Sequence, residues 1–281
     1  MSWFREKLYT HVQQAFEIKR ELHKGRTPFQ AVTVFENPML GRVLTLDGIC
    51  QTTEADEFVY HEMMTHVPIL AHGRATRVLI VGGGDGGILR ETLRHRRVKR
   101  AVMVEIDGEV VELCRRHLPS LSAGAFEDRR AELVVGDGAQ FMASTDERFD
   151  VMIIDSTDPM GPGEVLFRDA FYRNCKRCLK ADGIVVTQNG VPFFQREEFF
   201  STGRARAKLF GHSGFYFAAV PTYYGGHMAM GWASPGRDIT AVSLATLKRR
   251  FAAARLKTRY YNPEMHLAAF ARPNYLKSAK G

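Results

Sequence analysis

The feature that most constrains the fold is a series of short apolar runs that alternate with helix-like segments from residue 76 onward. These runs are rich in Val, Ile and Leu, and they occupy residues 77–81, 101–105, 132–135, 150–155 and 183–187. Buried parallel strands have this continuous apolar character, and the segments between them are typical of crossover helices. The sequence therefore predicts a doubly wound α/β sheet, in which ligands bind beyond the carboxyl ends of the strands.

The beginning of the chain shows a different pattern. Residues 30–35 alternate like a strand, and two short β runs flank Asp47-Gly48, which is a strong signal for a two-residue hairpin turn. Residues 54–70 then have the pattern of a helix. We therefore predict a small N-terminal β domain over residues 1–53 and a Rossmann-like domain over residues 54–281.

Composition limits the partners and the compartment. The chain has 281 residues, a formal net charge of +8 and four cysteines, too few in a chain of this length for a disulfide framework. No apolar run reaches the ~18 residues that span a bilayer, and the N-terminus mixes charges of both signs, unlike a secretion signal. We expect a cytoplasmic protein with no membrane partner. We also expect its basic runs to be solvated helix faces rather than a nucleic-acid surface.

A glycine-rich loop follows the first predicted strand of the sheet. Residues 82–87 read Gly-Gly-Gly-Asp-Gly-Gly, so Gly82, Gly84 and Gly87 match the pattern GxGxxG. Such glycines let the backbone approach a ligand closely, a feature that NAD, FAD and S-adenosylmethionine sites share. Asp85 inside the loop would repel a pyrophosphate and favour a cation, which argues against a dinucleotide. A turn-forming role for Asp85 is the structural alternative.

Acidic positions follow the next two strands. Glu105 ends the second strand about 20 residues past the glycines, where an acid commonly accepts hydrogen bonds from ribose hydroxyls. Asp137 and Gly138 follow the third strand, where they can bind an adenine edge or simply form a turn. Asp107 is better explained as a helix cap. These positions indicate an adenosine-like ligand without deciding which one.

The sharpest motif follows the fourth strand. Residues 155–162 read Asp-Ser-Thr-Asp-Pro-Met-Gly-Pro, which places Asp155 and Asp158 three residues apart in a loop held by prolines. Paired acids at a strand end can bind a metal, act as acid and base, or hold an amine. Because a metal would usually require His or further carboxylates nearby, we expect no metal here. If Asp85 is also close, three acids converge on one pocket.

Taken in this order, the motifs resemble those of the spermidine synthases, a family of polyamine aminopropyltransferases, and most closely the bacterial form. The resemblance runs over nearly the whole chain and rests chiefly on GGGDGG at 82–87 and DxxDPxGP at 155–162. Further matching segments are residues 51–54, 56–58, 60–62, 104–107, 136–138, 188–189, 221–223, 260–262, 266 and 270. The resemblance implies a fold like that of the class I S-adenosylmethionine methyltransferases, and an assembly of two or four identical chains.

The resemblance also implies roles for individual residues. Asp155 matches the proton acceptor of the family. The positions that hold the amine match Tyr60, His61, Asp85, Asp155, Ser156, Thr157, Asp158 and Tyr223. The positions that hold the adenosine portion of the donor or of methylthioadenosine match Gln30, Gly82, Gly84, Glu105, Asp137, Gly138 and Pro162. For Tyr60 and His61, packing within a helix is the structural alternative.

The implied reaction moves the propylamine group of the co-substrate decarboxylated S-adenosylmethionine to a diamine such as putrescine, without a metal or redox cofactor. The products would be spermidine and methylthioadenosine. An alkylamine has a pKa of about 10, so only on the order of one molecule in a thousand is neutral at pH 7, and the acceptor needs a base. Ordinary S-adenosylmethionine carries a carboxylate that Asp85 would repel, which favours aminopropyl transfer over methyl transfer.

Several alternatives stay open on the sequence alone. A methyltransferase acting on an amine would share this architecture, and a catalytically silent protein could bind a polyamine or a nucleoside. A nucleic-acid methyltransferase is suggested only by the net charge of +8. The length of the acceptor also stays open, because putrescine, cadaverine and spermidine differ in the distance between their amines.

Overall fold

Three β-sheets organise the chain in a computed structural model that describes residues 2–155 and 169–277. The largest sheet has seven strands in the order β12-β13-β11-β10-β7-β8-β9. Its parallel strands are β7 (Arg77–Gly82), β8 (Arg100–Glu105), β9 (Ala131–Val135), β10 (Phe149–Asp155) and β11 (Leu179–Gln188). The predicted parallel strands are therefore confirmed, and β7 and β10 lie next to each other near the middle of the sheet.

Two further strands extend this sheet, and the sequence analysis did not predict them. β12 (His212–Ala218) and β13 (Met228–Ser234) pair antiparallel, and β13 also pairs antiparallel with β11. Every residue of β13 is buried. The sheet is therefore mixed, with an antiparallel edge added to the predicted parallel part, as is common in large α/β sheets.

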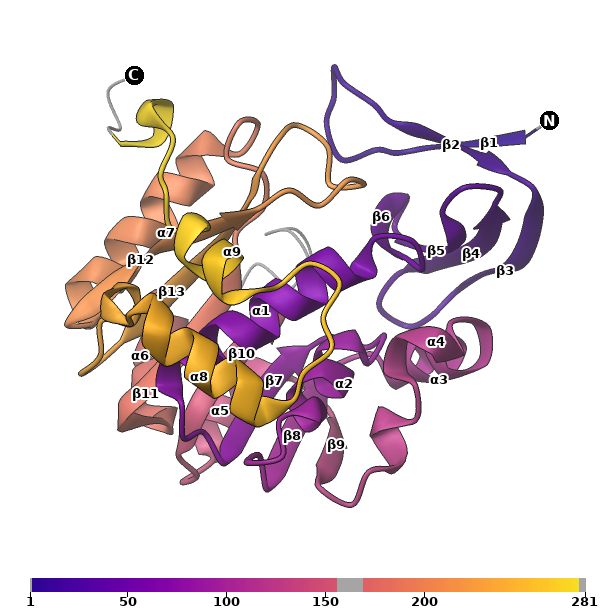
Figure 1. The fold of residues 1–281 in the computed structure, drawn as a ribbon. Helices are drawn as coiled ribbons and strands as arrows, with labels where there is room; N and C mark the ends of the chain where they lie inside the picture. The colour runs from indigo at the N-terminus through magenta and orange to yellow at the C-terminus, as the bar shows by residue number, and fades with distance from the viewer. Residues whose placement is uncertain (1, 156–168, 278–281) are drawn as a thin grey trace.

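Helices cover both faces of the large sheet (Figure 1). One apolar core lies under α1 (Glu57–His72), α2 (Gly87–Arg94), α8 (Leu244–Ala254) and α9 (Pro263–Ala268). The other lies under α5 (Gly138–Ser144), α6 (Asp169–Cys178) and α7 (Arg196–Leu209). Side chains of β7 alternate between the two cores, since Val78 and Ile80 belong to the first and Leu79 and Val81 to the second.

Two smaller sheets form the N-terminal part. β1 (Ser2–Arg5) pairs with β2 (Ala15–Ile18), and a four-stranded antiparallel sheet contains β3 (Arg20–Arg26), β4 (Ala31–Asn37), β5 (Gly41–Leu46) and β6 (Ile49–Thr53). The hairpin at Asp47-Gly48 is confirmed, with φ values of 49° and 80° in the left-handed region. The predicted domain boundary after residue 53 stays a prediction.

The N-terminal sheet is fixed beside the carboxyl end of β8. Val32, Val34 and Leu44 form an apolar cluster with side chains of α3 (Gly108–His117) and α4 (Pro119–Ser122), the two helices that follow β8. The helix predicted over residues 54–70 begins three residues later, as α1. Its first turns carry Tyr60 and His61, which lie near the carboxyl end of β8. Within the described ranges, no helix has both the length and the apolar character that crossing a membrane requires.

Candidate active site

A cavity lies where the carboxyl ends of β7, β8 and β10 meet the N-terminal strands. All predicted site residues in the described part of the chain line it, namely Gln30, Tyr60, His61, Gly82, Gly84, Asp85, Glu105, Asp137, Gly138, Asp155 and Tyr223. Apolar side chains such as Leu44 and Ile49 complete the wall. The remaining predicted residues, Ser156, Thr157, Asp158 and Pro162, lie outside the described residues. The structure thus brings the described candidates together, and their individual roles stay predictions.

Asp155 stands at the end of β10, directly beside the glycine loop. A Cβ on Gly82 would lie 2.0 Å from the carbonyl oxygen of Asp155, so only glycine fits there. The hydroxyl of Tyr60 donates a hydrogen bond of 2.5 Å to Oδ1 of Asp155. Because burial and the charge of Asp155 raise the pKa of Tyr60, the phenol remains protonated and can keep donating. The Asp155 carboxylate is therefore fixed in direction by a neutral donor.

The pKa of Asp155 is raised towards physiological pH. Burial raises its pKa to about 6, and the charge of Asp85 acts in the same direction, while the Tyr60 hydrogen bond and His61 oppose them. A carboxylate with a pKa this close to physiological pH is still ionised at pH 7, but it holds a proton far better than an exposed Asp. This is the property that a general base requires.

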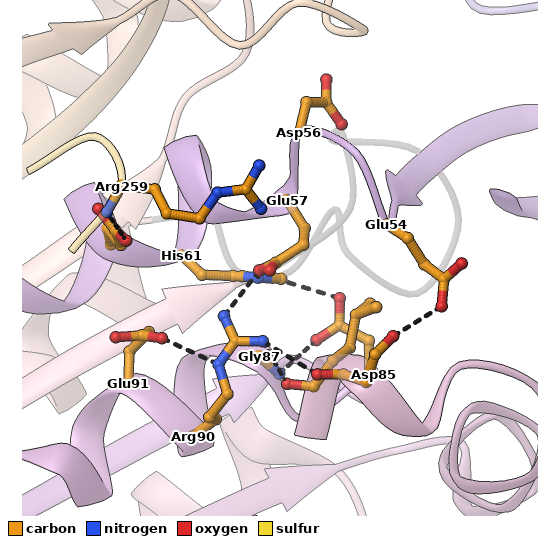
Figure 2. Close-up of polar contacts among 12 residues, drawn as sticks. Glu54, Asp56, Glu57, His61, Asp85, Gly87, Arg90, Glu91 and Arg259 are labelled. Carbon is orange, nitrogen blue, oxygen red and sulfur yellow. Dashed lines mark hydrogen bonds and ion pairs between the residues drawn. The ribbon is translucent and has the colours of Figure 1, made fainter. Parts of the chain in front are cut away.

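His61 lies between two carboxylates (Figure 2). Its Nδ1 is 2.5 Å from Oε2 of Glu57, and its Nε2 is 3.3 Å from Oδ2 of Asp85. The other oxygen of Asp85 accepts a hydrogen bond of 2.7 Å from the backbone N–H of Gly87. The turn-forming alternative for Asp85 is thus present in the structure, and it leaves the same carboxylate in the cavity wall.

Tyr223 completes the aromatic wall around Tyr60. The two rings meet edge to face, with centroids 5.8 Å apart, and the hydroxyl of Tyr223 donates to the carbonyl oxygen of Gln51. The preceding residue, Thr222, is held by Asp56, whose carboxylate accepts 2.8 Å hydrogen bonds from its N–H and its hydroxyl. Asp56 therefore ties the loop that carries Tyr223 to the start of α1.

Glu105, at the end of β8, also lines the cavity. Its Oε1 accepts a hydrogen bond of 2.9 Å from the N–H of Asp107, and burial raises its pKa to about 7. The predicted cap is confirmed, since Asp107 accepts from the N–H of Val110 at 3.2 Å. Asp107 also accepts from the amide of Gln30 at 2.9 Å, which holds Gln30 beside Glu105. A nearly neutral carboxyl and an amide thus face the space predicted for a nucleoside.

Asp137 caps a helix and also lines the cavity. Its Oδ1 caps α5 by accepting from the N–H groups of Ala139 at 2.7 Å and Gln140 at 3.2 Å. The next residue is Gly138, and only glycine fits there because a Cβ would lie 2.3 Å from Cγ1 of Val81. The turn alternative is therefore realised at Asp137, and ligand binding would use its remaining oxygen.

Sequence reasoning missed two acids, one buried and one partly buried. Glu6 is 2% exposed, lines the cavity, and accepts hydrogen bonds from the N–H of Cys50 at 2.8 Å and the amide of Gln14 at 3.1 Å. No motif surrounds it, so the sequence offers no signal. Glu57 was noted only as part of a matching segment, although its spacing of four residues from His61 on a helix predicts their contact.

In residues 2–155 and 169–277, no three or more His, Cys, Asp or Glu side chains are grouped so that they could hold a metal ion.

Two family profiles match the chain and together cover most of it. Residues 57–242 match the spermine/spermidine synthase domain, and residues 2–54 match the spermidine synthase tetramerisation domain. Among curated proteins, a polyamine aminopropyltransferase of Pseudomonas aeruginosa is 55% identical, with 100% of this chain and 98% of that protein covered. One from a Ruegeria species is 54% identical, covering 98% of this chain and 97% of the relative.

Solved structures give the same result for the fold. A spermidine synthase in complex with the transition state analogue AdoDATO superposes with a TM-score of 0.93 at 40% identity, covering 99% of this chain and 94% of the other. The spermidine synthase of Thermotoga maritima superposes with a TM-score of 0.90 at 38% identity, covering 99% and 93%. The predicted methyltransferase-like fold with a small N-terminal β domain is confirmed.

Proposed function

Because the chain belongs to the spermidine synthase family and is an aminopropyltransferase, we propose that it transfers the propylamine group of decarboxylated S-adenosylmethionine to putrescine, giving spermidine and methylthioadenosine. The observation that carries this proposal is that Asp85, Asp155 and Glu105 line one cavity. Asp85 and Asp155 suit a cationic amine, and Glu105 suits a ribose.

In the proposed reaction, the lone pair of the neutral amine attacks the methylene carbon bonded to the sulfonium sulfur. The new N–C bond forms as the C–S bond breaks, and the C–S electron pair remains on sulfur, which leaves as the neutral thioether methylthioadenosine. The proton of the nitrogen passes to the carboxylate of Asp155. Because the leaving group becomes neutral without a proton, we propose that neither an acid nor a metal nor a redox cofactor is needed.

The side chains around the cavity would divide this task. Asp155 would take the proton, and the hydrogen bond from Tyr60 would keep its carboxylate aimed at the amine. Asp85 and His61 would orient the amine, and Tyr223 would form the apolar wall along its methylenes. The rate would come chiefly from the alignment of the two substrates and from the fixed charges around them.

We further propose that the chain acts as a homotetramer, one of the two assemblies that the sequence predicted. The support is the match of residues 2–54 to a domain named for tetramerisation. In this part of the chain, the large hydrophobic side chains of Trp3, Val12, Phe29 and Met39 are exposed in the single chain. Exposed apolar residues of this size commonly mark contact surfaces. Light scattering after size exclusion would give four times the 31.7 kDa chain mass if this proposal holds.

One assay tests both substrates. The enzyme is incubated with decarboxylated or ordinary S-adenosylmethionine and with putrescine, cadaverine or spermidine, and the product masses are measured. Decarboxylated donor with putrescine should give the highest kcat/KM and a product that is larger by one propylamine unit. A product larger by one methyl group would instead identify an amine methyltransferase, and a higher kcat/KM for another amine would replace putrescine.

A further inference from the structure

A buried network of alternating charges extends from the amine side of the cavity into the protein (Figure 2). Asp85 contacts His61, and His61 contacts Glu57. Glu57 also forms an ion pair with Arg90, whose Nη2 lies 2.8 Å from Oε2 of Glu57. Arg90 is anchored in turn by the carbonyl oxygen of Leu121 at 2.6 Å. Arg90 also contacts Glu91 at 2.9 Å, and Glu91 is paired in turn with Arg94 and His66. At the cavity end of this network, two carboxylates face the single ring of His61, and a proton on both of its nitrogens would offset one of their charges.

The geometry of the ring favours that doubly protonated state. Both nitrogens of His61 face carboxylate oxygens, and a neutral imidazole has only one N–H to donate. A neutral ring would therefore point a lone pair at one of two ionised oxygens inside a buried site. His61 is 2% exposed, so water cannot relieve that repulsion.

The position of the ring is also fixed sterically. A Cβ on Gly87 would lie 2.2 Å from Nδ1 and Cε1 of His61, so the glycine loop leaves room for this ring and for little else. The edge of the Tyr60 ring packs against it with centroids 5.6 Å apart. His61 therefore cannot swing away from Glu57 and Asp85 without moving the loop.

We propose that Glu57 is a positioning residue that holds His61 as a cation, and that this cation beside Asp85 favours the neutral form of the acceptor amine. The inference rests on the proposed function. Without His61, the carboxylates of Asp85 and Asp155 would both stabilise an ammonium, which cannot attack. A fixed positive charge next to Asp85 offsets the negative charge of that carboxylate. The pKa of the bound amine is therefore lower, and the amine loses its proton at a lower pH.

The groups that face His61 agree with this assignment. Burial alone would lower its pKa, but Asp85 and Glu57 outweigh burial and raise the pKa to about 10. Asp155 on β10 and the protonated Tyr60 on α1 also act on or contact His61. Arg90 on α2 acts on Glu57 and is itself paired with Glu91, and Cys114 on α3, whose thiol is kept neutral by burial, lies near Asp85. The same contacts lower the pKa values of Glu57 and Asp85 against the effect of their burial, so both remain ionised.

The test replaces Glu57 by its nearest neutral equivalent. In Glu57→Gln, the new amide can donate to Nδ1 of His61, so the ring can stay in place as a neutral imidazole that donates Nε2–H to Asp85. The variant also removes the ion pair between Glu57 and Arg90, but Arg90 keeps its hydrogen bond to the carbonyl oxygen of Leu121 and its contact with Glu91. Glu112→Gln is the matched control, because Glu112 is also a helical Glu paired with an Arg, but it is largely exposed on α3 and is not among the residues that line the cavity.

The first readout is independent of activity. Histidines labelled with ¹³C at Cε1 are titrated by NMR, and the His61 signal is identified by its loss in His61→Gln. In the unaltered protein and in Glu112→Gln, we expect this signal to remain that of a cation up to about pH 9. In Glu57→Gln, we expect its midpoint to fall by at least about one pH unit. A His61 midpoint near 6.5 in the unaltered protein, or an equal midpoint in Glu57→Gln, overturns the role of Glu57.

The second readout is the pH dependence of kcat with both substrates saturating, which reports groups in the bound complex. Removal of one nearby charge should shift the alkaline rise of kcat upward by about one pH unit in Glu57→Gln. The double variant Glu57→Gln/His61→Gln should match His61→Gln alone. A fall in kcat that is uniform with pH would indicate a structural role and overturn the amine effect. No turnover with any amine would overturn the proposed function, while the NMR titration still decides the state of His61.

Discussion

Replacement of Asp155 by Asn should make the protein less active and more stable at the same time. Asp155 is held at the end of β10 with a pKa of about 6, raised from 3.8 chiefly by burial and also by Asp85. A raised pKa means that the folded protein binds the proton more tightly than the unfolded chain does. The protonated carboxyl is therefore compatible with folding, whereas the ionised carboxylate opposes it, and stability falls as the pH rises from about 4 through 6.

The size of the effect follows from the shift. A difference of about two pKa units corresponds to at most ~3 kcal/mol at pH 8, at about 1.4 kcal/mol per unit. Because Asp155 is only partly buried, we take about half of that, ~1–2 kcal/mol. For a chain of this size, the melting temperature should rise by about 2–6 °C at pH 8. The gain should be about half as large at pH 5 and should vanish below about pH 4.

Thermal unfolding is measured at pH 8 and pH 5 with equal protomer concentrations, because assembly also affects the midpoint. Asp150→Asn is the matched control on the same strand. Asp150 accepts hydrogen bonds from the N–H groups of Thr76 and Arg77 and pairs with Lys180, which outweigh burial and lower its pKa. That variant should be destabilised, and more so at pH 8 than at low pH.

Activity provides the other half of this prediction. Loss of a positioned base should lower kcat of Asp155→Asn by about 10²-fold or more. A variant with near-normal kcat would remove Asp155 from the role of base. A melting temperature that falls equally at both pH values would show that the Asp155 carboxylate stabilises the fold, contrary to the reasoning above.

Three further outcomes are expected. Asp85→Asn should narrow the difference in binding between decarboxylated and ordinary S-adenosylmethionine, measured by competition; an equal change for both would leave Asp85 with a structural role only. With donor saturating, kcat/KM for putrescine should rise between about pH 7 and pH 9 as the neutral amine becomes more abundant, and a flat or falling profile would show that deprotonation does not limit the reaction. Because the pKa of Glu105 is about 7, methylthioadenosine should bind up to ~10-fold more tightly at pH 8 than at pH 6, by calorimetry. Glu105→Gln should bind weakly at both pH values, and a retained pH dependence would assign it to another group.

The parallel sheet and the site could be predicted because their signals are local. Each strand of the doubly wound part is a short apolar run, and most of the predicted site motifs stand at the carboxyl end of such a run or on α1. The antiparallel hairpin of β12 and β13 was missed for the opposite reason. β12 contains Gly214 and β13 contains Gly231, and the two strands depend on pairing with each other and, through β13, with the distant β11.

The contacts between side chains from distant parts of the chain were also beyond the sequence. Tyr60 and Asp155 are 95 residues apart, and Asp56 and Thr222 are 166 apart, so no spacing rule connects them. Glu6 contacts Cys50, which is 44 residues away, and no local motif marks that contact. By contrast, the contact of Glu57 with His61 spans one helical turn and was open to prediction from the i, i+4 spacing.

The most direct test of the account is a single-turnover experiment with enzyme in excess over decarboxylated S-adenosylmethionine and with saturating putrescine. Methylthioadenosine and spermidine are quantified by mass spectrometry over time. The account predicts that both appear together in a ratio of one to one, and that Asp155→Asn slows both equally by about 10²-fold or more. Methylated putrescine, or methylthioadenosine formed without spermidine, would contradict aminopropyl transfer to this acceptor.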